Sequence, residues 1–405
     1  VIGGKIRTEI GKSVVDVAVQ IDGTHPALPA FSLFDLTDSQ GAYSFSVPTS
    51  SSYSVTPFRN SDPLNGVSTF DLLLINKHVL GLTPLASPYK IIAADANKSN
   101  TVTTFDIVEL RKLVLGLYQE LPANAAWRFV PVGFAFANPD NPFQGGFPES
   151  QTMVNLQQNN LPVHDFIGIK VGDVNDNVVP GVQSPGLDDR GGPPQYFDLA
   201  DQELRAGSIC ELELKSAEPL AGFQFTLNYD GLELLDVVPG AGLTAEHFAV
   251  FPENQTLTAS WDGAGQPSFQ LKFKVLRSGR LSEFLQLSNR IARSEAYTPG
   301  LETAALALRF DGGPALLPGA ELYQNRPNPF GERTEIGFYL PTAQTATLRV
   351  WDAAGRLVWE QPQWYPAGFH SVALQRRDLG AAASGFLFYE LTTETGRLVR
   401  KMVGY

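Results

Sequence analysis

The sequence of 405 residues has one cysteine, five histidines and no long apolar run. The single thiol, Cys210, excludes both a disulfide framework and a cysteine-based zinc site. No two histidines stand at a metal-ligand spacing such as H-x-x-x-H, and none lies near Cys210. Since no apolar run reaches the ~18 residues of a transmembrane helix, we expect no membrane span.

Charge is also scarce, at 18% of residues, and it is unbalanced: 30 Lys and Arg stand against 42 Asp and Glu, a formal net charge of -12. Binding a polyanion requires a basic face, so the balance argues against a nucleic-acid partner. An acidic chain is a more plausible partner for divalent cations.

Motifs of the common enzyme classes are missing. The chain has no G-x-S-x-G elbow, no Gly-rich phosphate loop and no G-x-G-x-x-G after a strand. A distant pair of catalytic carboxylates leaves no sequence signature, and we interpret the carboxylates as solvated surface charge. We therefore expect no enzyme. The chain begins at Val1 without a signal peptide, so we expect a processed product or a piece of a longer protein.

Turn residues and alternating strands dominate what is present: 43% of residues are hydrophobic, with 37 Gly and 29 Pro. The length predicts roughly two to four domains. Polar and apolar residues alternate with period two over residues 1–58, 195–314 and 315–405, which predicts antiparallel sheets with one buried face. In this pattern Cys210 is an ordinary small strand residue. Residues 178–194 are rich in Pro and Gly and predict an extended linker.

Residues 59–118 differ, because they contain an internal repeat. The segment 70–82 is repeated at 105–117, and both copies have apolar residues at helical spacing. Gly81 and Gly116 stand where a helix would end in a left-handed residue. The repeat predicts two matched helices packed as a pseudo-twofold pair.

The loop before the second helix predicts a calcium site. Oxygen-bearing side chains fill positions 1, 3, 5, 9 and 12 of a twelve-residue loop: Asp95, Asn97, Ser99, Thr103 and Asp106. At position 7, Thr101 would offer its backbone carbonyl. Calcium takes roughly six to eight oxygen ligands, and alternate positions of a tight loop can face one centre. The alternative is an Asx-turn followed by a helix N-cap.

A first loop aligned back from Asp71 is weaker. It offers Asn60, Asp62 and Asp71, but Leu64 cannot ligate at position 5. An ordinary turn remains the alternative to a calcium site there.

These loops resemble those of the dockerin family, which run D-x-N-x-D-G and end in Asp. Ser99 replaces the acid at position 5 and Asn100 replaces the Gly at position 6, and losing a carboxylate should weaken affinity. Residues 37–45 resemble the T-D-x-x-G-x-Y-x-F signature of carboxypeptidase-regulatory-like, immunoglobulin-type modules. Residues 1–177 together resemble a β-sandwich-plus-dockerin module of very large secreted bacterial surface proteins. That resemblance rests on segments 64–72, 88–95, 108–112 and 170–175.

Two further resemblances follow. Residues 220–230 and 232–237 resemble the cohesin-type sandwich. Residues 315–405 carry a net charge of +1, against -13 for the remainder, and resemble the type IX secretion C-terminal sorting domain. The latter rests on segments 322–330, 352–358, 366–368, 385–389 and 401–403. Its motif residues are Pro327, Asn328, Pro329, Phe330, Gly355 and Lys401.

Together these patterns predict a mainly β, multidomain chain of tandem β-sandwiches (immunoglobulin-like and cohesin-like) with one small α-helical dockerin-like module. The expected domains are 1–58, 59–177 with an aromatic-rich extension, the linker 178–194, 195–314 and 315–405. In the extension, the aromatics of 127–147 predict a small core, with a sugar platform as the alternative.

The resemblances imply a secreted, calcium-stabilised, non-catalytic surface protein with a structural or adhesive role, located outside the outer membrane. Its implied partners are the type IX secretion machinery, further copies in a homo-oligomer or filament, and glycan or surface lipopolysaccharide. The alternatives are the secretion and anchoring region of a larger enzyme, and a carbohydrate-binding module.

Overall fold

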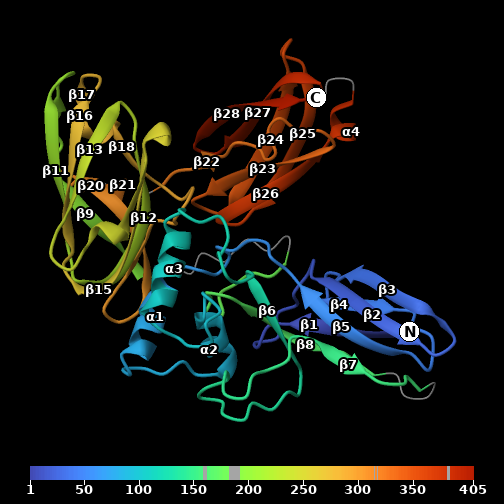
Figure 1. The fold of residues 1–405 in the computed structure, drawn as a ribbon. Helices are drawn as coiled ribbons and strands as arrows, with labels where there is room; N and C mark the ends of the chain where they lie inside the picture. Colours follow the sequence, from blue (N-terminus) through green and yellow to red (C-terminus); the bar gives the residue numbers. More distant parts are fainter. Residues whose placement is uncertain (158–161, 182–191, 314, 317, 381–383) are drawn as a thin grey trace. The chain divides into compact units, whose positions relative to one another are not determined.

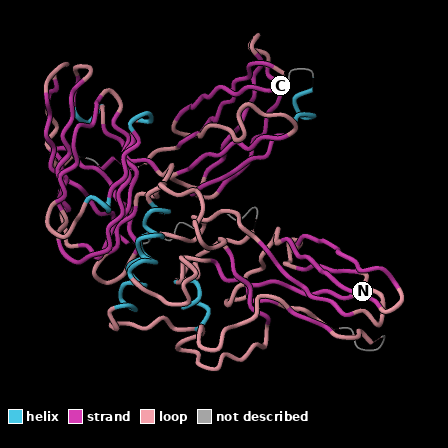
Figure 2. The backbone as a smooth tube through the Cα atoms, viewed as in Figure 1, coloured by secondary structure: helices cyan, strands magenta, loops and turns pink. Residues whose placement is uncertain are grey.

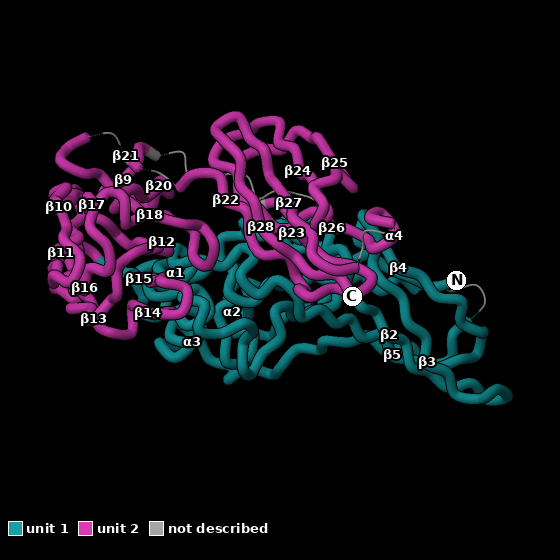
Figure 3. The backbone as a smooth tube through the Cα atoms, turned by 90° about the horizontal axis from the view of Figure 1, so that it is seen from above, with its two compact units in different colours: residues 1–184, 260–263 teal, residues 185–259, 264–405 magenta. Residues whose placement is uncertain are grey.

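The prediction of a mainly β chain is confirmed by a computed structural model (Figures 1 and 2). It describes residues 1–157, 162–181, 192–313, 315–316, 318–380 and 384–405. The chain divides into two compact units, which Figure 3 colours separately: residues 1–184 with 260–263, and residues 185–259 with 264–405. In the part that the structure describes, no helix is long and apolar enough to cross a membrane.

Unit 1 contains a β-sandwich of two four-stranded sheets. One sheet has the order β4-β1-β8-β6 and consists of β1 (Ile2–Arg7), β4 (Ala42–Phe45), β6 (Trp127–Pro131) and β8 (Phe166–Lys170). The other has the order β3-β2-β5-β7 and consists of β2 (Ala18–His25), β3 (Leu28–Leu36), β5 (Ser52–Phe58) and β7 (Gln151–Met153). Their inner faces share one core, which includes Val19, Ile21, Trp127 and Phe166.

The strands of this sandwich do not end at residue 58, where we expected a domain boundary. Strand β8 pairs in parallel with β1, with Phe166 opposite Ile6. Strand β7 pairs with β5, with Met153 opposite Tyr53. The alternating stretch before residue 58 supplies five strands, so the sandwich takes its remaining strands from the segment after the helices. The aromatic residues Trp127 and Phe129 accordingly join the sandwich core. The other four aromatics of this stretch are half-buried outside that core and contact one another: Phe134, Phe136, Phe143 and Phe147.

Three helices are inserted between β5 and β6. They are α1 (Thr69–Val79), α2 (Pro88–Ala94) and α3 (Thr104–Val114). The repeat predicted α1 and α3, and both begin with the same capping box, Ser68 with Asp71 and Thr103 with Asp106. Helix α2 was not predicted. It starts from the N-cap Ser87 with a proline in its first turn, and its short apolar run is buried.

Unit 2 begins with a second sandwich built on an eleven-stranded sheet. Its strands are β9 (Gly192–Leu199), β11 (Ile209–Ser216), β12 (Leu220–Tyr229), β13 (Leu232–Pro239), β14 (Phe248–Phe251), β15 (Thr256–Gly265), β16 (Ser268–Val275), β18 (Leu285–Ser288), β19 (Glu295–Tyr297), β20 (Thr303–Phe310) and β21 (Ala315–Leu316). A short ribbon pairs β10 (Glu203–Leu204) with β17 (Gly279–Arg280), and three single-turn helices are η1 (Ala245–His247), η2 (Pro252–Asn254) and η3 (Leu281–Glu283).

Alternation positions the core of this sandwich. Strand β11 buries every second residue, and Cys210 is one of them. The rings of Phe197, Phe223 and Phe269 contact each other at the centre, with Phe197 5.5 Å from Phe223 and 5.8 Å from Phe269. Strand β9 starts before the predicted boundary at 195, and β21 pairs with β20 beyond the predicted boundary at 314.

A third sandwich completes unit 2. Its elements are β22 (Glu321–Leu322), β23 (Arg333–Leu340), β24 (Gln344–Asp352), β25 (Leu357–Tyr365), β26 (Gly368–Gln375), α4 (Arg376–Leu379), β27 (Gly385–Thr393) and β28 (Gly396–Gly404). They form the sheets β22-β23-β26 and β25-β24-β27-β28. The two sheets enclose one apolar core that includes Phe330, Phe338 and Leu348.

Candidate metal centre

The predicted calcium loop 95–106 joins the end of α2 to the start of α3. Asp95 is the C-cap of α2, and Asp106 lies in the first turn of α3, so the two helix ends bring the carboxylates together. Both side chains are fully buried. The backbone N–H of Asn97 donates to Asp106 Oδ1 at 3.2 Å, which ties the start of the loop to its last position.

The loop coils around Asp95. The N–H of Ser99 donates to Asp95 Oδ1 at 2.9 Å, and the N–H of Asn100 donates to Asp95 Oδ2 at 3.0 Å. Ser99 also donates through its N–H to Asn97 Oδ1 at 3.0 Å, and through its hydroxyl to the Thr101 carbonyl at 3.1 Å. Lys98 and Asn100 have positive φ angles of 57° and 63°. The coil therefore links the residues of positions 1, 3, 5, 7 and 12 by hydrogen bonds, and calcium binding by them and by Thr103 at position 9 stays a prediction.

Buried negative charge makes this loop favourable for a cation. Burial raises the pKa of Asp95 above its usual value, and the charge of Asp106 adds to the effect. The guanidinium of Arg128 lies 3.9 Å from Asp95 Oδ2, but its short hydrogen bond goes to Glu149, at 2.8 Å. A cation among the loop oxygens would stabilise both ionised carboxylates.

The first predicted loop is arranged differently from the second. The Asn60 side chain accepts from the N–H of Ala126 at 2.8 Å and donates to Glu120 at 3.0 Å. Asp62 forms an ion pair with Arg59 at 3.5 Å, and its side chain is 66% exposed. The described contacts of Asn60 and Asp62 therefore do not include Asp71, the third predicted ligand.

Asp71 instead meets a segment from the far end of unit 1. Its Oδ1 accepts from the N–H of Val174 at 3.0 Å, and its Oδ2 accepts from the N–H of Ser68 at 3.0 Å. The chain coils around the neighbouring Asp173 as it coils around Asp95. The N–H groups four and five residues ahead, those of Asn177 and Val178, donate to Asp173 Oδ1 and Oδ2 at 3.3 and 2.9 Å.

Residues 173–177 match 95–99 position by position. Asn175 Oδ1 accepts from the N–H of Asn177 at 3.1 Å, as Asn97 accepts from Ser99. Asp176 at position 4 has a φ of 63°, and Lys98 at the same position has a φ of 57°. Asp173 thus corresponds to position 1, Asn175 to position 3 and Asn177 to position 5.

The second half of this split loop precedes α1. Residues 65–71 align with 100–106, and Asp71 is position 12. Asn65 joins the two halves: its side chain donates to the Val179 carbonyl at 2.7 Å and accepts from the Val179 N–H at 3.1 Å. Gly66 has a φ of 77°, and a Cβ there would lie 2.7 Å from the Val178 backbone. A glycine is therefore required where the two chain segments meet.

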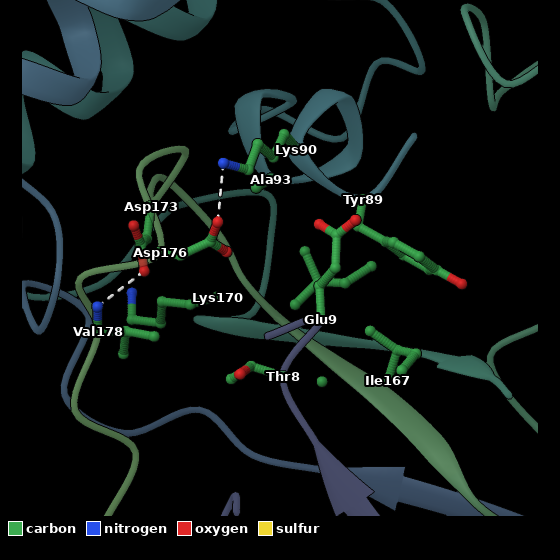
Figure 4. Close-up of a pocket in the computed structure, with 12 residues that line it drawn as sticks. Thr8, Glu9, Tyr89, Lys90, Ala93, Ile167, Lys170, Asp173, Asp176 and Val178 are labelled. Carbon is green, nitrogen blue, oxygen red and sulfur yellow. Dashed lines mark hydrogen bonds and ion pairs between the residues drawn. The ribbon is translucent and has the colours of Figure 1, made fainter. Parts of the chain in front are cut away.

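The split loop holds more charge than the continuous one. Burial raises the pKa of Asp71, and the nearby charge of Asp173 raises it further; burial also raises the pKa of Asp173. Lys170 is buried beside them, which lowers its pKa to about 8, and its ammonium donates to the carbonyl of Pro63 at 2.7 Å. Figure 4 shows Lys170 beneath Asp173, with the ion pair of Lys90 and Asp176 at 2.7 Å above.

A cavity of about 20 Å³ adjoins the split loop, lined by Lys170, Asp173 and Asp176 among others (Figure 4). This volume holds about one water molecule, so it offers no room for an organic substrate.

The donor chemistry of both loops fits calcium. Carboxylate, amide, hydroxyl and carbonyl oxygens are the ligands of hard cations. Neither loop contains a His or a Cys, so both lack the nitrogen and sulfur donors of zinc. The described residues contain no group of three or more His, Cys, Asp or Glu side chains placed to hold a metal, so amide, hydroxyl and carbonyl oxygens would have to complete each calcium site. Sequence reasoning missed Asp173, Asn175 and Asn177, although the run D-x-N-x-N repeats the D-x-N-x-S of residues 95–99.

The predicted sorting residues have structural positions in the third sandwich. The peptide bonds before Pro327 and Pro329 are cis. Phe330 is fully buried and its N–H donates to the Val403 carbonyl at 2.9 Å. The Asn328 side chain accepts from the Val403 N–H, also at 2.9 Å.

Of the other two sorting residues, Gly355 lies in a turn of the larger sheet of that sandwich and Lys401 lies in its strand β28. Gly355 has a φ of 78° in the turn between β24 and β25. The ammonium of Lys401 lies 4.5 Å from the centre of the Phe386 ring. A role in sorting remains a prediction for all of these residues.

Helices α1 and α3 carry a further polar contact inside unit 1, to the four residues of β15 that belong to this unit. Thr69 Oγ1 lies 2.7 Å from Ser260 Oγ, and Asn76 donates to Asp262 Oδ2 at 3.1 Å. The Arg111 guanidinium forms an ion pair with the same Asp262 carboxylate. The two matched helices therefore present one amide and one cation to a single acid.

No family model matches the chain, and no curated protein matches it. Among solved structures, a non-cellulosomal cohesin of Archaeoglobus fulgidus is 18% identical over 28% of this chain and 86% of its own, with a TM-score of 0.22. A ScaB type I cohesin of Pseudobacteroides cellulosolvens is 13% identical over 29% and 88%, with a TM-score of 0.21. BcpA, the major pilin subunit of Bacillus cereus, is 8% identical over 99% and 91%, with a TM-score of 0.20. At these values the likenesses carry no argument, and the β-sandwich architecture rests on the sheets themselves.

Proposed function

We propose that the chain is a calcium-stabilised, non-catalytic part of a secreted surface protein, with a structural or adhesive role. The observation that carries the proposal is the pair of matched oxygen loops at the starts of α1 and α3. Each loop buries two carboxylates, and each connects elements that are otherwise separate. Such loops stabilise a fold through a bound cation.

Calcium would be held at two places. In the continuous loop the ligands are Asp95, Asn97, Ser99, the Thr101 carbonyl and Asp106. In the split loop they are Asp173, Asn175, Asn177 and Asp71. The ion would neutralise the buried carboxylates, and in the split loop it would also fix the chain after β8 to the start of α1. Thr103 caps α3, donating its N–H to Asp106 Oδ2 at 2.8 Å, so it orients a ligand.

Differential scanning calorimetry of the full chain tests this stabilisation. We expect a higher melting temperature in calcium than in chelator, because an ion that binds only the folded state shifts the unfolding equilibrium. Magnesium is the matched control, since it is smaller and retains its water more strongly. Equal melting temperatures in calcium and in chelator would refute the proposal.

We further propose that residues 315–405 direct export by the type IX route. The support is the order of the motif segments along the last strands of the chain. Fused to a periplasmic reporter in a type IX host, these residues should send the reporter outside the cell. Equal export after deletion from Pro327 to the end would refute this assignment.

We also propose that copies of the chain assemble, which the resemblance of residues 59–177 to a dockerin module and of residues 220–237 to a cohesin supports. Pairing of these modules between chains would build a homo-oligomer or a filament. Light scattering should detect large assemblies in calcium and none in chelator. A wild-type chain that stays monomeric at high concentration would contradict assembly.

A further inference from the structure

The outer face of the sheet β3-β2-β5-β7 carries an exposed apolar patch. Strand β2 lies between β3 and β5 (Figure 1), and Ala18 lies opposite Leu36 on one side and Phe58 on the other. One row further along, Phe34 lies opposite Gln20. The side chains of Phe34, Phe58 and Leu36 are 64%, 57% and 49% exposed. Large apolar side chains gathered on one exposed face often mark a binding surface.

A row of small polar side chains continues the same face. Asp22 lies opposite Ser32 of β3 and opposite Ser54 of β5, and Ser54 lies opposite Thr152 of β7. Successive side chains of a strand point to opposite faces of the sheet. These polar residues therefore share the outer face with Gln20, whereas apolar residues between them pack in the sandwich core.

The polar row lines an open groove of about 660 Å³. The groove crosses all four strands of this sheet, and no described residue of the opposing sheet lines it. Sites for small organic ligands have volumes of roughly 300–1,000 Å³. The patch and the groove together extend along β2 from Ala18 to Thr24, which is about 20 Å at ~3.3 Å per residue. The face therefore offers a long, straight and open strip.

These rows contain a single charged side chain, Asp22, and hydrogen bonds hold it. Gln20 donates through Nε2 to Asp22 Oδ1 at 3.1 Å and to Oδ2 at 2.9 Å. Hydrogen bonds from Ser32 and Gln20 lower the pKa of Asp22, so the carboxylate is ionised at neutral pH. An ionised carboxylate accepts hydrogen bonds and repels anions. The face therefore suits a neutral ligand that has both hydroxyl groups and apolar surface.

We propose that this face binds a neutral, β-1,4-linked oligosaccharide, which lies over β2 from the patch into the groove. Hydroxyl groups of the sugars donate to Asp22 and exchange hydrogen bonds with Ser32 and Ser54. The C–H faces of the sugar rings contact Phe34 and Phe58, which lie on either side of β2, about 10 Å apart across the sheet. A β-1,4-linked chain is extended and flat, so it can follow a straight strip, whereas an α-1,4-linked chain coils.

A sugar fits this face better than an apolar partner does. An apolar surface would remove water from the carboxylate and the hydroxyls of the groove without offering them hydrogen bonds. The proposal goes beyond the calcium function and uses no residue of either loop. Sugar binding should therefore persist in chelator as long as the first sandwich stays folded, so the two proposals fail separately.

Isothermal titration of the full chain with cellohexaose tests the ligand class. We expect cellohexaose to bind, and maltohexaose to bind at least about tenfold more weakly, because its α-1,4-linked chain coils away from the strip. A hexamer of galacturonic acid should also bind more weakly, because its carboxylates meet that of Asp22. No binding of cellohexaose, or equal binding of cellohexaose and maltohexaose, would overturn the proposal.

Substitutions on the face test where the sugar binds. Phe34→Ala and Phe58→Ala should each weaken cellohexaose binding about tenfold, as truncation of a contacting aromatic side chain does. Both rings are exposed, so the melting temperature should not change. Trp364→Ala is the matched control, because Trp364 is also an aromatic residue on a strand, 61% exposed, but it lies on β25 of the third sandwich. Binding that survives both Phe substitutions, or that falls as much with Trp364→Ala, would contradict the assignment of this face.

Discussion

The two oxygen loops of unit 1 have the same geometry and different chain connections. The continuous loop runs from Asp95 to Asp106 in one segment. The split loop takes positions 1 to 5 from the segment after β8 and its last position, Asp71, from the first turn of α1. In both, the position-1 carboxylate accepts from N–H groups four and five residues ahead, and the position-12 carboxylate belongs to a capping box.

Because their chain connections differ, the two loops are held together in different ways. Covalent connection fixes the continuous loop, whereas Asn65 and the sandwich hold the halves of the split loop. Lys12 contributes from the sandwich by donating to the carbonyls of Asp176 and Val178, both at 2.8 Å. The split loop should therefore depend on the fold of the whole unit, and a cation there should stabilise more of the chain.

Removing calcium should have the largest effect. A ligand at a hundred times its dissociation constant stabilises the folded state by about 2.7 kcal/mol per site, so two filled sites would contribute roughly 5 kcal/mol. Chelator should lower the melting temperature of unit 1 and leave that of unit 2 unchanged, because both loops lie in unit 1. A calcium shift in the unfolding transition of unit 2 alone would contradict this account.

Single-site variants separate the two loops. Asp106→Asn and Asp173→Asn should each remove about half of the calcium-dependent stabilisation, roughly 3 kcal/mol. Asp62→Asn is the matched control, because the Asp62 side chain is largely exposed. Thermal melts with and without calcium measure the effect. If Asp62→Asn lost as much calcium-dependent stability as Asp173→Asn, the ligands of this site would come from residues 60–71 and not from the split loop.

The junction of the split loop offers a smaller test. Asn65→Ala removes two hydrogen bonds to Val179 and should cost about 1 kcal/mol in the presence of calcium. The comparison is Asn100→Gly at the corresponding position of the continuous loop, because glycine adopts the φ of 63° of Asn100 without the strain of alanine. Its side chain is exposed, so the substitution should cost less. Urea unfolding curves give both values, and equal costs would contradict the idea that a side chain joins the split loop.

Acid should destabilise the first sandwich through His164, and bound calcium should not prevent this loss. His164 is buried between the Tyr53 hydroxyl and the Gln151 amide, each at 3.0 Å, and burial lowers its pKa below 6.5. Below pH 6.5 the unfolded chain therefore binds more protons than the folded chain, because His164 has the higher pKa when it is unfolded. The stability held by neutral His164 is therefore present above pH 6.5 and lost as the pH falls through the lower folded pKa.

Thermal melts between pH 5 and 8 in saturating calcium measure this loss. His164→Gln should flatten the pH dependence, because glutamine can accept and donate without titrating. An unchanged slope in His164→Gln would assign the acid sensitivity to another group.

Local patterns predicted much of this structure. Period-two alternation located the strands of all three sandwiches, and the repeat located α1 and α3. The D-x-N-x-S run and Asp106 located the continuous loop, because all its members lie within twelve residues. Each of these features is set by neighbours in sequence, so one sequence suffices to find it.

Features that depend on distant segments were missed. The parallel pairing of β8 with β1 joins residues from opposite ends of unit 1, and the short strand β8 carries no mark of its partner. Asp71 was aligned with Asn60 and Asp62 because the alignment assumed a continuous loop. The D-x-N-x-N run at Asp173 was visible, but only the fold shows that it lies against α1.

Isothermal titration of the full chain with calcium tests the central claim most directly. The account predicts two calcium ions per chain for the wild type, and one each for Asp106→Asn and Asp173→Asn. No binding to the wild type would contradict the account, and so would a single ion whose binding is unaffected by Asp173→Asn.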